Sequence, residues 1–176
     1  MEHIERIKRE LKHTGSMLKM YDDTIQVPNG NIAHWDFIEH SGAAAVVPVL
    51  DDGKILMVRQ YRNSLDRYTL EIPAGGLNGN EPTKLAAARE LEEETGYQCG
   101  SIKKLISIVT AVAFCNEIID IYTATDLRKT QQNLDEDEYI NVESYSLDEL
   151  KHMIQEEIIQ DSKTISAILA YESFCL

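Results

Sequence analysis

Residues 75–97 read GGLNGNEPTKLAAARELEEETGY, and this stretch determines most of what the sequence predicts. Pro82 can open a helix, because the N–H that proline lacks has no partner in the first turn. The residues from Lys84 to Thr95 are nearly all strong helix formers, and Gly96 is of the type that most often ends a helix in the left-handed conformation. The stretch therefore predicts a glycine-rich loop followed by one helix.

The predicted helix carries three glutamates on one face. Glu90, Glu93 and Glu94 follow the i, i+3, i+4 spacing, so their carboxylates lie side by side. Like charges at this spacing destabilise a helix by about 0.2–0.5 kcal/mol per pair, and a bound cation would relieve this repulsion. Such oxygen ligands suit Mg²⁺ or Mn²⁺ better than zinc. The alternative is a solvated acidic face, which is what most glutamate runs are.

The complete spacing resembles the Nudix box, the signature of hydrolases that cleave a nucleoside diphosphate linked to another group. The fixed polar and glycine positions of the box are all matched, and only Tyr97 replaces a usual aliphatic residue. Three flanking segments resemble the ADP-ribose pyrophosphatase branch of this family: Arg59-Gln60-Tyr61-Arg62, Leu70-Glu71-Ile72-Pro73-Ala74-Gly75 and Asp135-Glu136-Asp137-Glu138. The resemblance runs over roughly residues 25–170.

Apolar patterning indicates an α/β protein, and the resemblance implies a Nudix α/β/α sandwich with a mixed sheet and an N-terminal β-hairpin. We expect residues 1–40 to form the N-terminal strands and residues 41–176 to form the Nudix hydrolase domain. The segment 4–12 shows only a weak helical or irregular pattern. The segments 16–27 and 33–39 predict the two strands of the hairpin, on either side of a Pro-Asn-Gly-Asn turn.

The resemblance assigns the metal ligands. Glu90 and Glu94 would be the principal carboxylate ligands, with Glu93 supporting or joining them. The backbone carbonyl of Ala74 would be another ligand, and Glu138 would complete the coordination of a further ion.

The resemblance also assigns the residue that activates water. Glu136 is the counterpart of the loop glutamate with this role, although Asp135, Asp137 and Glu138 stay open as alternatives because four acids are adjacent. A carboxylate within hydrogen-bond reach of the water can take its proton.

Several box residues are expected to organise the site. Arg89 should pair with the box glutamates, Glu93 in particular, and hold their side chains in place. Glu81 has a similar expected role at the end of the loop. Gly75 and Gly76 would let the loop turn tightly beside the metal.

Four residues are candidates for contacts with the substrate. Arg62 would hold a phosphate or the terminal ribose, because a guanidinium matches those oxygens. Arg59 is a second candidate, which faces the other side of an alternating strand. Trp35 would stack on adenine, unless it belongs to the core or a dimer interface, and Glu117 would contact the substrate or a metal.

Charge and cysteine content limit the function classes. A net charge of −13 argues against a nucleic-acid partner and requires local cations to attract a phosphorylated substrate. The three cysteines have no framework spacing, and neither a signal-like start nor a membrane-length apolar run is present. We therefore expect a cytoplasmic protein without a membrane partner.

The resemblance implies a Mg²⁺-dependent enzyme, with Mn²⁺ as a possible substitute, that splits ADP-ribose into AMP and ribose 5-phosphate. It also implies a homodimer whose N-terminal strands exchange. Residues 110–117 read TAVAFCNE, where many relatives carry a Ser-Pro-Gly turn, so another nucleoside diphosphate derivative such as a GDP-sugar or NADH is the alternative. A nucleotide-sensing module without catalysis is the rival class, but such a module would typically lack a box glutamate or carry a DNA-binding domain.

Overall fold

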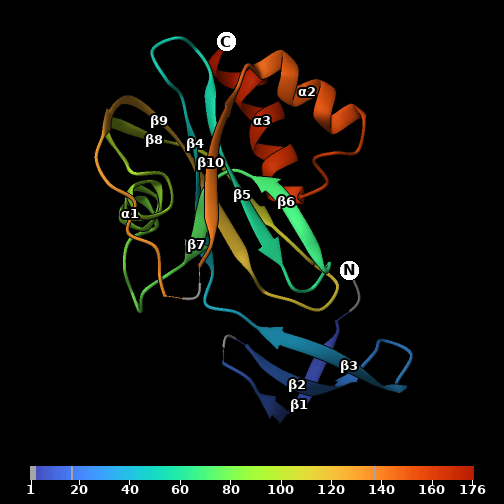
Figure 1. Cartoon of the computed structure of the whole chain (residues 1–176). Coiled ribbons are helices and arrows are strands. Elements are labelled where there is room, and N and C mark those ends of the chain that lie inside the picture. The colour runs from blue at the N-terminus through green and yellow to red at the C-terminus, as the bar shows by residue number, and fades with distance from the viewer. Residues whose placement is uncertain (1–2, 17, 137) are drawn as a thin grey trace. The chain divides into compact units, whose positions relative to one another are not determined.

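The computed structural model describes residues 3–16, 18–136 and 138–176, which divide into two compact units. The first unit comprises Met1–Gly42 and Val109–Ile118, and the second comprises Ala43–Ile108 and Ile119–Leu176. Figure 1 shows the course of the chain. Each helix in the described ranges is too short or too polar to cross a membrane.

The first unit contains an antiparallel sheet in the order β1-β2-β3. Its strands are β1 (Glu5–Thr14), β2 (Lys19–Gln26) and β3 (Ile32–Glu39). Strands β2 and β3 form the expected hairpin, with Gln26 opposite Ile32 beside the turn. The expectation of a helical or irregular segment over residues 4–12 is wrong, because β1 pairs with β2 along its length. Pairing with a neighbouring strand overrides a weak local propensity.

The second unit holds the mixed sheet and the helices. The strands are β4 (Ala43–Pro48), β5 (Ile55–Arg62), β6 (Arg67–Glu71), β7 (Ala74–Gly76), β8 (Tyr97–Val109), β9 (Ile118–Lys129) and β10 (Ile140–Tyr145). The helices are α1 (Thr83–Thr95), α2 (Leu147–Gln155) and α3 (Ser162–Cys175). One sheet has the order β7-β4-β9-β8, with β4 and β9 parallel and β4 and β7 antiparallel, and the other is the antiparallel sheet β10-β5-β6.

Strand β4 is buried on both faces and belongs to two hydrophobic cores. Ala45 and Val47 pack in the core that includes α2 and α3, whereas Ala44 and Val46 pack in the core beneath α1. This division follows from the strand geometry, in which successive side chains point to opposite faces. Figure 1 shows α1 on one side of the strands of this unit and α2 and α3 on the other. The layering expected for an α/β/α sandwich is therefore present.

Helix α1 has the ends that the sequence predicts. It begins directly after Pro82, and it ends at Gly96, which has a left-handed φ of 71° and donates its N–H to the Glu92 carbonyl at 2.8 Å. Between these ends the helix packs Ala87 and Leu91 against β4 and β9. The same face carries glutamates, and their positions define the candidate site.

Candidate active site

A polar cavity of about 410 Å³ lies between β7, the loop that follows it, helix α1 and the acidic loop before β10. The predicted site residues that line it are Ala74, Gly75, Gly76, Arg89, Glu90, Glu93 and Glu138. Asp135, one of the alternatives for the base, lines the cavity too, and so do Leu77, Asn78 and Asn133, for which the sequence predicted no role. Segments that are far apart in the chain therefore meet at one polar cavity.

Glu90 lies directly against the glycine loop and is only 8% exposed. A Cβ atom on Gly75 would overlap the carboxylate of Glu90, whereas a Cβ atom on Gly76 would meet no atom within 4 Å. The absence of a side chain at Gly75 thus provides the space that the carboxylate occupies. The two glycines were both expected to serve the turn, and the structure separates their contributions.

The guanidinium of Arg89 holds the acidic side chains around it. Its Nη1 donates to Glu90 Oε1 at 2.6 Å and to Glu93 Oε2 at 2.8 Å, and its Nη2 donates to Glu81 Oε1 at 2.8 Å. Glu81 also accepts the backbone N–H of Asn78 at 2.7 Å, which ties the loop to the same network. The expected pairing of Arg89 with Glu93 and the expected position of Glu81 at the loop end are both present.

Glu94 is the most deeply buried of the box glutamates, with 3% exposure. Its Oε2 accepts the backbone N–H of Ala74 at 3.1 Å. Burial and the charge of Glu90 raise the pKa of Glu94 to about 8, and the charge of Glu138 acts in the same direction. Burial raises the pKa of Glu90 as well. Carboxylates in this situation are stabilised either by protons or by a cation.

The donor set fits a divalent cation in its chemistry, because Mg²⁺ takes hard oxygen ligands such as the carboxylates of Glu90 and Glu94. Within the ranges that the structure describes, however, no three such side chains form a ready-made metal cluster. Glu90 and Glu93 instead point toward the guanidinium of Arg89. Glu90 uses its Oε1 for Arg89, so a cation at its Oε2 would leave that contact intact.

The acidic loop contributes at least one carboxylate to this region. Glu138 lines the cavity, and its charge acts on both Glu90 and Glu94. Glu136 lies in a turn and is exposed, and Asp137 lies outside the described residues. The structure thus brings Glu138 to the predicted metal ligands, and the role of Glu136 as the base stays a prediction.

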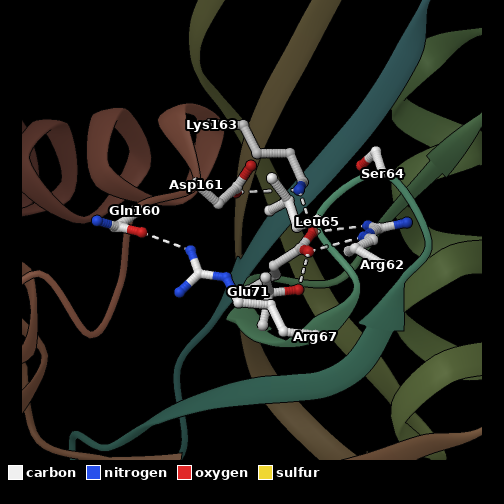
Figure 2. A pocket seen from close by; sticks show the side chains of 9 residues that line it. Arg62, Ser64, Leu65, Arg67, Glu71, Gln160, Asp161 and Lys163 are labelled. Carbon is white, nitrogen blue, oxygen red and sulfur yellow. Dashed lines mark hydrogen bonds and ion pairs between the residues drawn. The ribbon is translucent and has the colours of Figure 1, made fainter.

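The two arginines of β5 form similar ion pairs on opposite faces of the strand. Arg62 donates from Nε and Nη2 to the two oxygens of Glu71, at 2.7 and 2.6 Å. Arg59 donates in the same way to Glu143, at 2.6 and 3.0 Å. Arg62 also lines a second cavity, of about 450 Å³, that Figure 2 shows from close by.

Glu71 and Lys163, for which the sequence predicted no role, contact each other beside Arg62. A signal for Glu71 existed, because an acid between Leu70 and Ile72 interrupts an apolar strand just before the glycine loop. Lys163 stands at the start of an ordinary amphipathic helix and gave no local signal.

Two predicted substrate contacts, Trp35 and Glu117, belong to the first unit. Trp35 is exposed on β3. Glu117 accepts the hydroxyl of Thr110 at 2.7 Å and lies 3.4 Å from Nδ1 of His40. Their contacts with a substrate stay predictions.

Comparisons with known proteins identify the family of this chain. A family model, the NUDIX domain, matches residues 39–166. The chain is 42% identical to the Methanol dehydrogenase activator of Bacillus methanolicus over 164 residues, which cover 92% of this chain and 89% of that protein. It is 36% identical to the ADP-ribose pyrophosphatase of Bacillus subtilis, with the same coverage of both chains.

A third relative is the ADP-ribose pyrophosphatase of Mycobacterium tuberculosis, which is 42% identical over 73% of this chain and 63% of that protein. A solved structure titled "Crystal structure of ADP compounds hydrolase" superposes with a TM-score of 0.89, covering 99% of this chain and 95% of that chain at 20% identity. That likeness concerns the fold. Together these findings confirm the resemblance stated for residues 75–97 and the sandwich fold that it implied.

Replacing Gly75 with alanine should displace the carboxylate of Glu90 and weaken the binding of divalent cations by about tenfold or more. Calorimetric titration with Mn²⁺ measures this affinity. Gly76→Ala is the matched control, since it adds the same methyl group to the neighbouring residue in open space. We expect that control to bind Mn²⁺ like the wild type. Equal affinities of the two variants would refute the steric argument.

The raised pKa of Glu94 predicts how the stability of the metal-free protein depends on pH. Its folded pKa of about 8 exceeds the ordinary glutamate value, so between the two values the folded state keeps a proton that the unfolded state has lost. The stabilising contribution of the neutral carboxyl is therefore present at low pH and is lost as the pH rises through 8.

We expect Glu94→Gln, which stays neutral, to melt at a higher temperature than the wild type in a chelator. The difference should grow between about pH 5.5 and about pH 8.5. Adding Mg²⁺ at the upper pH should raise the melting temperature of the wild type more than that of the variant. A difference in melting temperature that does not change with pH would contradict this account of Glu94.

Proposed function

The chain belongs to the Nudix family of hydrolases, and from this membership we propose that it hydrolyses the pyrophosphate linkage of ADP-ribose or a related ADP-sugar. With ADP-ribose the products would be AMP and ribose 5-phosphate. The observation that carries the proposal is the pair of buried glutamates, Glu90 and Glu94, on one helix beside the polar cavity. The relatives from B. subtilis and M. tuberculosis, both named ADP-ribose pyrophosphatase, support the substrate class.

We propose Mg²⁺ as the cofactor, with Mn²⁺ as a substitute, in keeping with the general use of divalent ions in this family. Glu90, Glu94, Glu138 and the carbonyl oxygen of Ala74 would hold it, with Glu93 beside them. When bound, Mg²⁺ neutralises the phosphoryl oxygens and lowers the pKa of a coordinated water.

The side chains of this protein would divide the remaining tasks. Glu136 would take a proton from the attacking water. The water oxygen bonds to one phosphorus while the bond from that phosphorus to the bridging oxygen breaks, so each product leaves with one phosphate. Arg89 keeps Glu81 and Glu93 in place through the hydrogen bonds described above. Arg62 would hold the phosphates, because its guanidinium has donors that Glu71 does not use.

Three further contacts complete the proposal. Trp35 would stack on the adenine, and Glu117 would contact the substrate. Arg59 is the weaker candidate, since its bidentate pair with Glu143 already occupies one edge of its guanidinium.

One relative, the Methanol dehydrogenase activator, is named for an effect on a dehydrogenase and not for a substrate. We keep hydrolysis of an ADP-sugar as the proposal, because two relatives that share most of this chain carry the pyrophosphatase name. Another nucleoside diphosphate derivative, such as a GDP-sugar or NADH, is the alternative substrate class. A sensor without catalysis is less favoured, since the acidic cluster of the site is complete.

We also propose that the enzyme is a homodimer that acts in the cytoplasm. The first unit exposes Ile4, Ile7 and Leu11 on or beside β1, and apolar side chains that gather on a surface commonly mark an interface. The cysteines Cys99, Cys115 and Cys175 are unpaired, as is usual in a reducing compartment.

A substrate panel tests the proposed function. Purified protein with Mg²⁺ is given ADP-ribose, ADP-glucose, GDP-mannose, NADH and diadenosine polyphosphates, and the release of AMP or other products is measured. We expect the highest kcat/KM on ADP-ribose, and a loss of several orders of magnitude in Glu94→Gln. Better turnover of another compound would keep the hydrolase and replace the substrate. Tight binding of ADP-ribose without turnover would favour the sensor.

Variants of the acidic loop test the identity of the base. We expect Glu136→Gln to lower kcat by about a hundredfold or more while leaving the affinity for Mn²⁺ unchanged, because a general base contributes about 10²–10⁴-fold. Glu138→Gln should weaken the affinity for Mn²⁺ instead. If Glu136→Gln turns over normally and Glu138→Gln loses kcat alone, the base is Glu138.

A further inference from the structure

The carboxylate of Glu71 lies between two cations, and Figure 2 shows the guanidinium of Arg62 on one side of it and the ammonium of Lys163 on the other. Oε1 accepts hydrogen bonds from Arg62 Nε at 2.7 Å and from the hydroxyl of Thr69 at 2.6 Å. Oε2 accepts from Arg62 Nη2 at 2.6 Å and from Lys163. Both oxygens of the carboxylate are therefore fully engaged, and Glu71 has one favoured orientation.

Because Glu71 and Lys163 are buried, the loss of any one of the charged groups around Glu71 would destabilise the others. Glu71 is 2% exposed and Lys163 is 8% exposed. Burial alone would raise the pKa of Glu71, but the hydrogen bond from Arg62 and the charge of Lys163 lower it to about 2. Glu71 is thus an anion throughout the physiological pH range. A buried charge that loses one partner is strongly destabilised, so each partner constrains the others.

Lys163 connects this network to the start of α3. Its ammonium also lies 3.0 Å from Asp161, the N-cap of that helix, whose carboxylate accepts the N–H of Thr164 at 3.0 Å. The hydroxyl of Thr164 in turn accepts the backbone N–H of Ile72 at 3.0 Å. Helix α3 is therefore tied to the chain immediately before the glycine loop as well as to the Arg62–Glu71 pair.

Arg62 is held along one edge only. Its Nε and one N–H of Nη2 face Glu71, and its side chain keeps 38% of its surface exposed. The charges of Glu94 and Arg62 act on each other, so the guanidinium lies within electrostatic reach of a box carboxylate. The free edge of the guanidinium is consequently available to a ligand near the candidate active site.

The charge balance of the second cavity agrees with an anionic ligand. Its lining includes Arg62, Arg67 and Lys163 as cations and Glu71 and Asp161 as anions, which leaves a net positive charge. Arg67 donates to the neutral amide of Gln160. This local excess stands against a net charge of −13 for the whole chain. A phosphorylated molecule would therefore meet less repulsion at this cavity than the overall charge implies.

We propose that Glu71 and Lys163 are positioning residues for substrate binding, which hold the guanidinium of Arg62 with its free edge toward the pyrophosphate. This inference rests on the proposed function, since it names what orients the arginine that contacts the phosphates. A guanidinium that is fixed before the substrate arrives loses less rotational freedom on binding than a mobile one. Lys163 acts at a distance, through Glu71, and does not contact the substrate.

A double-mutant cycle on KM tests the proposal. We expect Lys163→Met to raise KM by about tenfold and to leave kcat within about threefold, because the loss of a hydrogen bond to a charged group has roughly this effect on affinity. Arg62→Gln should raise KM at least as much. In the Arg62→Gln background, Lys163→Met should have almost no further effect on KM, because its effect passes through Arg62.

Lys151→Met is the matched control. Lys151 forms an ion pair with Glu172 between α2 and α3, away from both cavities, so its removal changes a lysine–glutamate pair without touching the network. We expect this control to keep the wild-type KM. If Lys163→Met does not fold, the isosteric Glu71→Gln takes its place in the cycle, and circular dichroism establishes that each variant is folded.

The outcomes separate this inference from the proposed function. An unchanged KM in the folded Lys163→Met variant, or a tenfold effect that persists in the Arg62→Gln background, would overturn the positioning role while the hydrolase stands. If the wild type turns over none of the panel, the proposed function fails, and the same cycle is measured as the Kd of ADP-ribose by calorimetry. The absence of both turnover and binding would overturn both proposals.

Discussion

The structure of the site depends on two buried carboxylates, those of Glu90 and Glu94, which lie one turn apart on α1. They lie beside a loop in which Gly75 has no side chain. Glu90 fills the space that the glycine leaves, and Glu94 is held by the backbone N–H of Ala74. Acids in such a place raise the free energy of the folded state unless protons or cations neutralise them. Arg89 supplies part of that neutralisation from within the chain, since it donates to Glu90 and Glu93. The protein therefore folds around buried acids that its own cations neutralise only in part.

The network around Glu71 is also held by buried charges, but the signs are reversed relative to the network around Arg89. At Glu71 two cations surround one buried acid, whereas at Arg89 several acids surround one cation. Glu71 ends β6 and Arg89 lies on α1, so the two networks fix the chain before and after the segment that contains β7 and the glycine loop. A segment that is held by charged groups at both ends is restricted in its conformation.

Local signals predicted the helix, its ends and the hairpin, because each depends on residues that are near one another in sequence. Pro82 and Gly96 are examples, since a proline and a glycine limit the backbone directly. Strand β1 was predicted wrongly because its pairing with β2 is a tertiary effect that its charged sequence does not reveal. The sequence also indicated the face of the box glutamates and the guanidinium of Arg89 that pairs with them, because these residues are neighbours on one helix. Glu71 and Lys163 are separated by most of the second unit, so no spacing rule connects them.

Because both faces of β4 are buried, substitutions along this strand are expected to have two different kinds of effect. The side chains of β4 point alternately to its two faces. Ala44 and Val46 pack in the core beneath α1, the helix that carries the acidic site. Ala45 and Val47 pack in the core with the C-terminal helices α2 and α3. Substitutions at neighbouring residues of β4 therefore disturb different cores. Natural variation at alternate positions should separate into two classes, one visible as altered turnover and the other as altered abundance in the cell.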